Sequence, residues 1–140
     1  MPTEPQRPRR PQQYGGGRGD ITVVVDCSEL ARAAAFWTQV LDYVVEQEAE
    51  GLFQSLVPAD GVGVEILLQR VHEAKDGKNR VHLDLRTRDM DAEVRRVVDL
   101  GATLVTTQPI VEDGWVWHVL LDPDGNEFCV LQPTPDYWEA

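Results

Sequence analysis

A tight turn followed by a short apolar strand occurs twice in this chain and limits the folds available to it. The second copy, DPDGNEFCVL, begins at Asp122. Asp-Pro fixes one backbone φ angle and Asp-Gly supplies a residue free to adopt a positive φ, which is typical of a reversing hairpin connection. The runs on either side, residues 115–121 and 127–131, are rich in aromatic and aliphatic side chains. We therefore predict a hairpin of two strands there.

The first copy lies at residues 58–67 and reads PADGVGVEIL. Matching the two Asp-Gly pairs, 60–61 and 124–125, places the following strands in register without a gap, so that Glu65 falls opposite Cys129. The similarity extends upstream, because a strand-like run at 21–25 and another at 81–85 are each followed by a helical segment. The chain is thus predicted to use a β-α-β-β-β unit twice.

The helices are expected near residues 29–41 and 89–100, where apolar residues recur at helical spacing. Ser28 is the predicted N-cap of the first helix and Asp89 that of the second. Trp37 is expected to fill the core rather than to contact a ligand. Further strands are predicted at 43–49, 52–57, 62–71 and 103–107, and a loop at 109–114.

Length and composition set the domain organisation. With 140 residues, of which 42% are hydrophobic, the chain is long enough for one compact core and too short for two ordinary domains. We expect a flexible tail rich in Pro, Arg and Gly over residues 1–19, one domain over 20–132 with modules at about 20–71 and 80–132, and a C-terminal tail over 133–140. Each module exposes a sheet face that needs cover, so we predict a homodimer.

Charge and hydropathy exclude several classes of partner. Residues 1–19 carry four arginines and one glutamate, a net charge of +3. Because the whole chain has a net charge of −11, residues 20–140 carry −14. So acidic a body repels phosphate backbones, and we expect no nucleic-acid partner. No apolar run approaches the roughly 18 residues of a membrane span, so we expect a cytoplasmic protein without a membrane partner. Cys27 and Cys129 lack metal-finger spacing and predict no disulfide framework.

The repeat, the run His82-Leu83-Asp84-Leu85 and the closing motif at 122–129 together resemble the glyoxalase/bleomycin-resistance/extradiol-dioxygenase superfamily, also called vicinal oxygen chelate proteins. The resemblance covers about residues 20–132. It implies an α+β fold of two β-α-β-β-β modules, whose curved mixed sheets form a cleft. It says little about the reaction, because lyases, isomerases, dioxygenases and pure binders share this fold.

The resemblance also implies where a metal would be held. The ligand positions of metal-dependent members fall on about Thr22, Glu65, His82 and Cys129, and only Glu65 and His82 match the usual His and Glu pattern. Thr22 offers neither imidazole nor carboxylate, and Cys129 offers a soft thiol that suits zinc. We do not favour a resident metal or other cofactor; a divalent metal, if held, would be zinc bound by Glu65, His82 and Cys129.

The expected function is therefore that of a glyoxalase-like small-molecule-binding protein that needs no metal. In a lyase or isomerase reaction, Glu65 would move a proton and His82 would assist it or bind a metal. Asp84, Trp115, Trp117 and Cys129 would contact the ligand.

Two alternatives stay open. One is a non-catalytic protein that sequesters a drug in the manner of bleomycin-resistance proteins, and the other is a metal-dependent lyase or dioxygenase. The acidic body favours a cationic ligand and the two tryptophans an aromatic one, although both rings could equally belong to the core.

Overall fold

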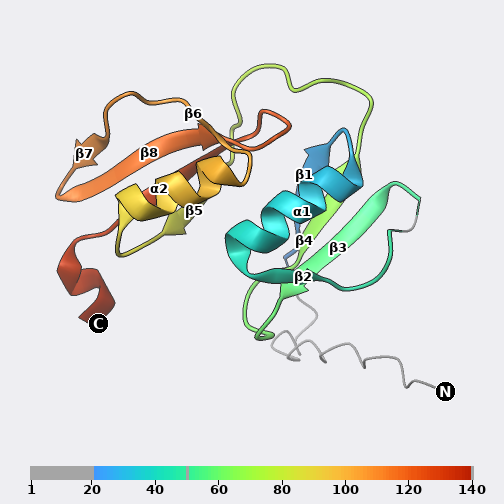
Figure 1. The fold of residues 1–140 in the computed structure, drawn as a ribbon, viewed down its shortest axis with the longest axis horizontal. Coiled ribbons are helices and arrows are strands. Elements are labelled where there is room, and N and C mark those ends of the chain that lie inside the picture. The colour runs from blue at the N-terminus through green and yellow to red at the C-terminus, as the bar shows by residue number, and fades with distance from the viewer. Residues whose placement is uncertain (1–20, 50, 140) are drawn as a thin grey trace. The chain divides into compact units, whose positions relative to one another are not determined.

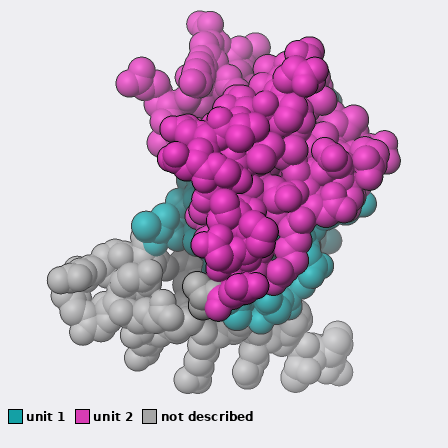
Figure 2. Space-filling model, turned by 90° about the vertical axis from the view of Figure 1, so that its left-hand side faces the viewer, with its two compact units in different colours: residues 1–71 teal, residues 72–140 magenta. Residues whose placement is uncertain are grey.

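We describe a computed structural model of the chain, which covers residues 21–49 and 51–139. The chain divides into two compact units, residues 1–71 and 72–140, which Figure 2 colours separately. The predicted tail over residues 1–19 lies outside the described residues. Neither of the two α-helices in the described part is long and apolar enough to cross a membrane.

The first unit contains one helix on a four-stranded mixed sheet (Figure 1). The strands follow the order β1-β4-β3-β2, with β1 parallel to β4 and the other pairs antiparallel. Its elements are β1 (Val23–Cys27), α1 (Leu30–Leu41), β2 (Tyr43–Val45), β3 (Phe53–Pro58) and β4 (Ile66–Arg70).

The second unit repeats this plan with one additional strand. Its sheet runs β5-β9-β8-β6, with β5 parallel to β9 (Figure 1). The additional strand, β7, pairs antiparallel with the first residues of β8. Its elements are β5 (Leu83–Arg86), α2 (Met90–Asp99), β6 (Thr103–Leu104), β7 (Ile110–Glu112), β8 (Trp115–Leu121), β9 (Glu127–Gln132) and a short 3-10 helix η1 (Pro135–Glu139) within the predicted C-terminal tail.

In each unit the core lies between the helix and one face of the sheet. Trp37 of α1 is 2% exposed and Leu68 of β4 fully buried, as are Val97 of α2 and Val130 of β9. The placement of Trp37 in the core is confirmed. The α+β class and the two modules with mixed sheets are confirmed as well, whereas the cleft between the sheets and the homodimer stay predictions.

The two helices begin differently. Asp89 caps α2 as predicted, because its carboxylate accepts a hydrogen bond from the backbone N–H of Ala92 at 3.1 Å. The predicted cap Ser28 is wrong, since α1 begins one residue later, with Glu29 at the N-cap and no side-chain hydrogen bond there. The Ser28 hydroxyl instead accepts a hydrogen bond of 2.8 Å from the guanidinium of Arg32.

The segment predicted as a loop at 109–114 is part of a β-hairpin. Strand β7 pairs with β8 across Asp113 and Gly114, which have φ angles of 51° and 80°. Two successive positive φ values suit the tight turns that join antiparallel strands, and Asp-Gly is a preferred pair for them. The predicted strand at 62–71 is also shorter than expected, since it begins only at Ile66.

The gap-free register between the two modules is wrong by two residues. Leu56 pairs with Ile66, ten residues on, whereas Leu120 pairs with Phe128, eight residues on. The connection between β3 and β4 therefore holds two residues more than the one between β8 and β9. In consequence Leu67, which pairs with Val24, occupies the position that corresponds to Cys129, and Glu65 corresponds to Glu127.

Candidate functional site

The two faces of the second sheet differ in what covers them. On β9, the side-chain oxygen of Gln132 accepts a hydrogen bond from the first backbone N–H of α2 at 2.9 Å, so the even-numbered side chains face the helix. Phe128 and Val130 share that face and are buried. Asp84, Cys129 and the other side chains of alternate parity lie on the opposite face, which we call the open face.

Three side chains with different chemistry meet at the open face. His82 precedes β5, Asp84 lies within it, and Asp84 stands directly opposite Cys129 in the parallel ladder between β5 and β9. A ring nitrogen of His82, a carboxylate oxygen of Asp84 and the sulfur of Cys129 all lie within 4.8 Å of one another. The Nε2 atom of His82 is 3.2 Å from Oδ1 of Asp84, and these two side chains are 48% and 42% exposed, whereas Cys129 is 6% exposed.

Burial raises the pKa of the Cys129 thiol from 9.0 to about 11. The negative charge of Asp84 and a hydrogen bond from the thiol to that carboxylate act in the same direction, while the ammonium of Lys78 opposes them. Cys129 is therefore a protonated donor at neutral pH rather than a nucleophilic thiolate. The Asp84 carboxylate accepts a hydrogen bond from this thiol and also lies beside the imidazole of His82.

The linker before β5 is bonded to the first residue of β9. The carboxylate of Glu127 accepts a hydrogen bond from the backbone N–H of Asn79 at 2.9 Å and pairs with Lys75 Nζ at 3.3 Å. The Asn79 side chain also donates to the Glu127 carbonyl oxygen at 3.2 Å. These bonds, led by that of the Asn79 amide, lower the pKa of Glu127. The linker is thus fastened two residues from Cys129.

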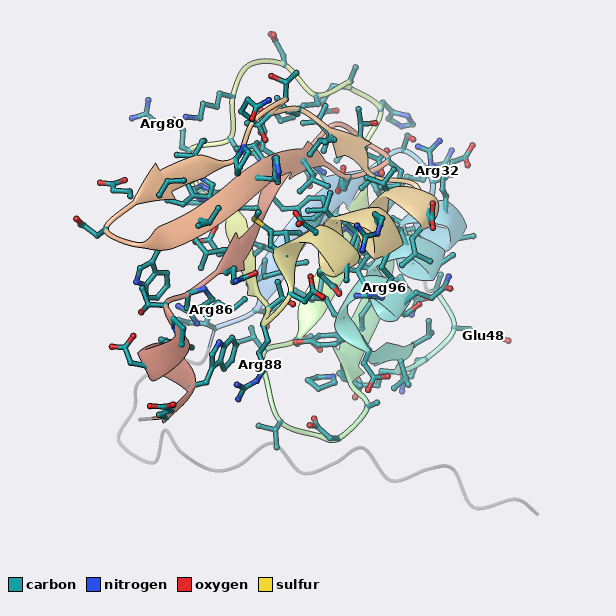
Figure 3. All side chains as sticks on the ribbon, turned by 60° about the vertical axis from the view of Figure 1, so that its left-hand side comes forward. Arg32, Glu48, Arg80, Arg86, Arg88 and Arg96 are labelled. Carbon is teal, nitrogen blue, oxygen red and sulfur yellow. The ribbon has the colours of Figure 1, made fainter. Side chains whose placement is uncertain are left out.

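The C-terminal 3-10 helix packs on residues at the start of β8 and the end of β5. The ring centroid of Tyr137 lies 5.5 Å from that of Trp115 and 4.9 Å from that of Trp138, both in edge-to-face geometry. The guanidinium of Arg86 lies 5.4 Å from the Tyr137 centroid and that of Arg88 lies 4.7 Å from the Trp138 centroid (Figure 3). These contacts hold residues 135–139 against the sheet.

The tryptophans predicted to bind ligand have different surroundings. Trp115 is half-buried and packs on Tyr137, so its ring is engaged within the chain. Trp117 is also half-buried and shares the parity of Cys129 relative to the sheet, since it pairs with Leu131. His118 pairs with Val130 and therefore lies on the helix side, and its Nδ1 is 2.7 Å from the Thr106 hydroxyl oxygen.

Glu65 lies in the first unit and has partners there. Its carboxylate accepts hydrogen bonds from the hydroxyls of Thr22 at 3.1 Å and Ser55 at 2.8 Å. Thr22 and Leu67 occupy the positions that correspond to His82 and Cys129, and neither can bind a metal through an imidazole or carboxylate. The structure thus brings together His82, Asp84 and Cys129 within one unit and places Glu65 in the other.

The cluster supports two kinds of chemistry. The imidazole of His82 is exposed and oriented by a carboxylate, which suits a general acid or base. Its nitrogen, the Asp84 oxygen and the Cys129 sulfur also form a donor set of the kind that zinc prefers, with Asp84 in place of Glu65.

Sequence reasoning missed Asp84 as a metal donor, the anchoring role of Glu127 and the packing of Tyr137 and Trp138. The adjacent aromatic residues near the C-terminus were the available signal for that packing.

Comparisons with known proteins agree with the fold. The sequence profile of the glyoxalase-like domain family matches residues 22–131. No curated protein matches the sequence significantly. The hypothetical protein SA1046 from S. aureus is 19% identical with a TM-score of 0.63, over 84% of this chain and 100% of that one. A glyoxalase/bleomycin resistance protein/dioxygenase family enzyme from Burkholderia phytofirmans PsJN is 20% identical with a TM-score of 0.62, over 79% and 95%.

A third similar structure contains ligands. It is a mutant of the fosfomycin resistance protein FosX from Listeria monocytogenes, complexed with Mn(II) and 1S,2S-dihydroxypropylphosphonic acid. It is 15% identical with a TM-score of 0.68 and covers 84% of this chain and 92% of that one. At such identities the likeness to these structures shows a shared fold and no more.

Proposed function

Because this chain belongs to the glyoxalase-like domain family, within the glyoxalase/bleomycin resistance/dioxygenase superfamily, we propose that it binds a small molecule on the open face, at His82, Asp84 and Cys129, without a resident metal. The observation that carries this proposal is the convergence of an imidazole, a carboxylate and a thiol within 4.8 Å on a sheet face that the helix leaves free. Convergent polar groups of this kind are typical of binding sites.

The internal bonding of the cluster favours the metal-independent form. Asp84 already accepts a hydrogen bond from the Cys129 thiol and lies beside His82. A metal would have to displace the thiol proton, whose pKa is about 11, and burial opposes that loss. The corresponding positions of the first unit, Thr22 and Leu67, add no usual metal ligand.

We assign proton transfer to His82 in a lyase or isomerase reaction of the glyoxalase type. Its Nε2 is held beside Asp84 at 3.2 Å, which leaves the other ring nitrogen for the ligand. Glu65 is the weaker candidate, because both of its carboxylate oxygens already accept hydrogen bonds. Trp117 is the tryptophan we expect to stack on an aromatic ligand, since Trp115 is packed against Tyr137.

Native mass spectrometry of protein purified without chelators tests this proposal directly. We expect the mass of the chain with no zinc, with or without a retained organic ligand, and a dimeric assembly would support the predicted homodimer. A retained compound that the protein releases unchanged would favour sequestration over catalysis. One tightly held zinc ion per chain would contradict the metal-independent form.

The second candidate is a zinc-dependent enzyme, and the donor set itself favours it. His82, Asp84 and Cys129 would then hold the ion, which would supply Lewis-acid chemistry to a bound substrate. Cobalt(II) titration checks this because a thiolate–cobalt bond gives a near-ultraviolet charge-transfer band. The band should appear in the natural protein and vanish in Cys129→Ser but persist in Cys27→Ser. Its absence in the natural protein would exclude a thiolate-bound metal.

A further inference from the structure

Positive charge is concentrated around the candidate site of an otherwise acidic chain. Residues 75–88, here called the basic segment, carry five of the nine Lys and Arg residues found after residue 19. The segment also contains two aspartates, so its net charge is +3. Residues 20–140 together carry −14, so the part of this range outside the segment carries −17. The cations are Lys75, Lys78, Arg80, Arg86 and Arg88.

Two of these cations are available to a ligand. Lys75 pairs with Glu127, and Arg86 and Arg88 lie against the rings of the 3-10 helix. Lys78 and Arg80 are exposed and have no hydrogen-bond or ion-pair partner among residues 21–49 and 51–139. Arg80 extends into solvent (Figure 3), so its long side chain is free to fold over a bound group.

The backbone that carries these cations is held in place. Asn79, the residue between them, is bound to Glu127 through its backbone N–H and its side-chain amide. Lys78 is the neighbour of Asn79 in the chain, and Asn79 is bonded to Glu127, two residues before Cys129 on β9. His82 follows two residues after Arg80 and is half exposed. The cations therefore border the cluster of His82, Asp84 and Cys129 instead of lying on a remote solvated surface.

We propose that the small molecule bound at the open face carries an anionic group, a carboxylate, phosphate or phosphonate, which Lys78 and Arg80 hold beside His82. This inference rests on the proposed function and specifies its ligand class. Arg presents a planar fork that matches such oxyanions, and Lys supplies a point charge.

The local charge outweighs the acidic character of the whole chain at this site. Screening limits the reach of exposed charges to about 8–10 Å at physiological ionic strength, so a ligand at the cluster responds mainly to its neighbours. The acid within the cluster, Asp84, already accepts a hydrogen bond from Cys129 and lies 3.2 Å from Nε2 of His82. The cationic ligand expected from the net charge of −11 is therefore disfavoured at this site.

Amide NMR titrations of the full chain test the inference with three probes: methylphosphonate, acetate and choline. We expect methylphosphonate, acetate or both to shift the amide signals of residues 78–84 and 127–131 in a saturable way, with a Kd of about 1–10 mM for so small a probe. Comparison of the two anions identifies whether a phosphonate or a carboxylate is preferred. Choline should leave these signals unchanged.

Charge-removing variants supply the controls. Lys78→Gln and Arg80→Gln should each weaken anion binding by about three- to tenfold, whereas Arg95→Gln, an exposed arginine on α2, should not. Equal binding in all three variants would mean unspecific association and overturn the inference. If choline binds and both anions fail, the ligand class is wrong but the site stands. If no probe shifts these amides, both the inference and the proposed function fail.

Discussion

Asp84 and Cys129 stand directly opposite each other on neighbouring parallel strands, and the thiol of Cys129 donates a hydrogen bond to the Asp84 carboxylate. The thiol is buried and the carboxylate is 42% exposed. The pair therefore joins a protonated sulfur below the surface to a charged oxygen that a ligand can reach. The pKa of Cys129 therefore reports on the charge of Asp84 and on its contact with the thiol.

The first prediction concerns the substitution Asp84→Asn. It removes a negative charge and a carboxylate acceptor that both raise the thiol pKa, so the pKa of Cys129 should fall below its value of about 11. Burial, the largest cause of the shift, remains, so the pKa should stay above 9.0. The measurement is the pH dependence of iodoacetamide labelling, with peptide mass spectrometry to separate Cys129 from Cys27.

The matched control is Asp91→Asn, which removes an exposed acid in the first turn of α2. It should leave the labelling profile of Cys129 unchanged. An Asp84→Asn profile that coincides with that of the natural protein would show that the carboxylate does not contact the thiol in solution.

The second prediction is a loss of stability in alkali. Below pH 9 the Cys129 thiol is protonated in both the folded and the unfolded chain, so it adds no pH dependence. Between pH 9 and about 11 the unfolded thiol ionises while the folded one stays protonated, so the free energy of unfolding should fall as pH rises. The natural protein should lose about 1–3 kcal/mol more than Cys129→Ala over this range. Denaturant unfolding at several pH values measures the difference, and parallel curves for the two proteins would refute it.

Much of the fold could be predicted because its signals are local. The cap Asp89 binds an amide three residues away, and the helical spacing that predicts α1 also places Trp37 in the core. The hairpin through Asp113 and Gly114 carried the same Asp-Gly signal as the opening motif. It was missed because its strand β7 has only three residues, too few to show alternation.

The register error has a different cause. Side chains on a strand alternate with a period of two, so a shift by two residues returns every side chain to its original face. The alternation in 62–67 therefore could not distinguish Glu65 from Leu67 as the counterpart of Cys129.

The contacts of Glu127 with Asn79 and of Tyr137 with Trp115 were beyond sequence reasoning for another reason. They join segments far apart in the chain or depend on how a short terminal helix folds back.

The third prediction tests the buried histidine under α2. The Thr106 hydroxyl oxygen accepts a hydrogen bond from the backbone N–H of Val119 at 3.1 Å and lies 2.7 Å from His118 Nδ1. Thr106→Val would leave both groups without this partner, so the free energy of unfolding should fall by about 1–3 kcal/mol. Thr103→Val, at an exposed position on β6, should change it by less than about 0.5 kcal/mol. Equal unfolding curves for the two variants would contradict the assigned bond.

The fourth prediction concerns the C-terminal 3-10 helix. Tyr137 contacts the rings of Trp115 and Trp138 and the guanidinium of Arg86. Tyr137→Ala should therefore lower the free energy of unfolding by about 1–2 kcal/mol and expose Trp115 to acrylamide quenching. Val111→Ala removes a side chain that is 66% exposed and should do neither. Unchanged quenching in Tyr137→Ala would mean that residues 135–139 do not cover Trp115 in solution.

The last prediction concerns Glu127, which fastens the linker beside the cluster. Its carboxylate accepts a hydrogen bond from the Asn79 amide and pairs with Lys75, and these contacts lower its pKa. The anchoring should therefore persist at pH values below the ordinary pKa of Glu. It should be lost as the pH falls further, through the lowered pKa of the folded chain. Glu127→Gln removes the charge at any pH. Hydrogen exchange in residues 75–80 should then accelerate by about tenfold, because a bond to a charged acceptor is lost.

Glu112→Gln, at the exposed end of β7, is the matched control and should leave that exchange unchanged. If the linker positions Lys78, Glu127→Gln should also weaken methylphosphonate binding, although it removes a negative charge. A purely electrostatic role would instead strengthen the binding of an anion. The direction of the change therefore separates the positioning of the cation from simple charge balance.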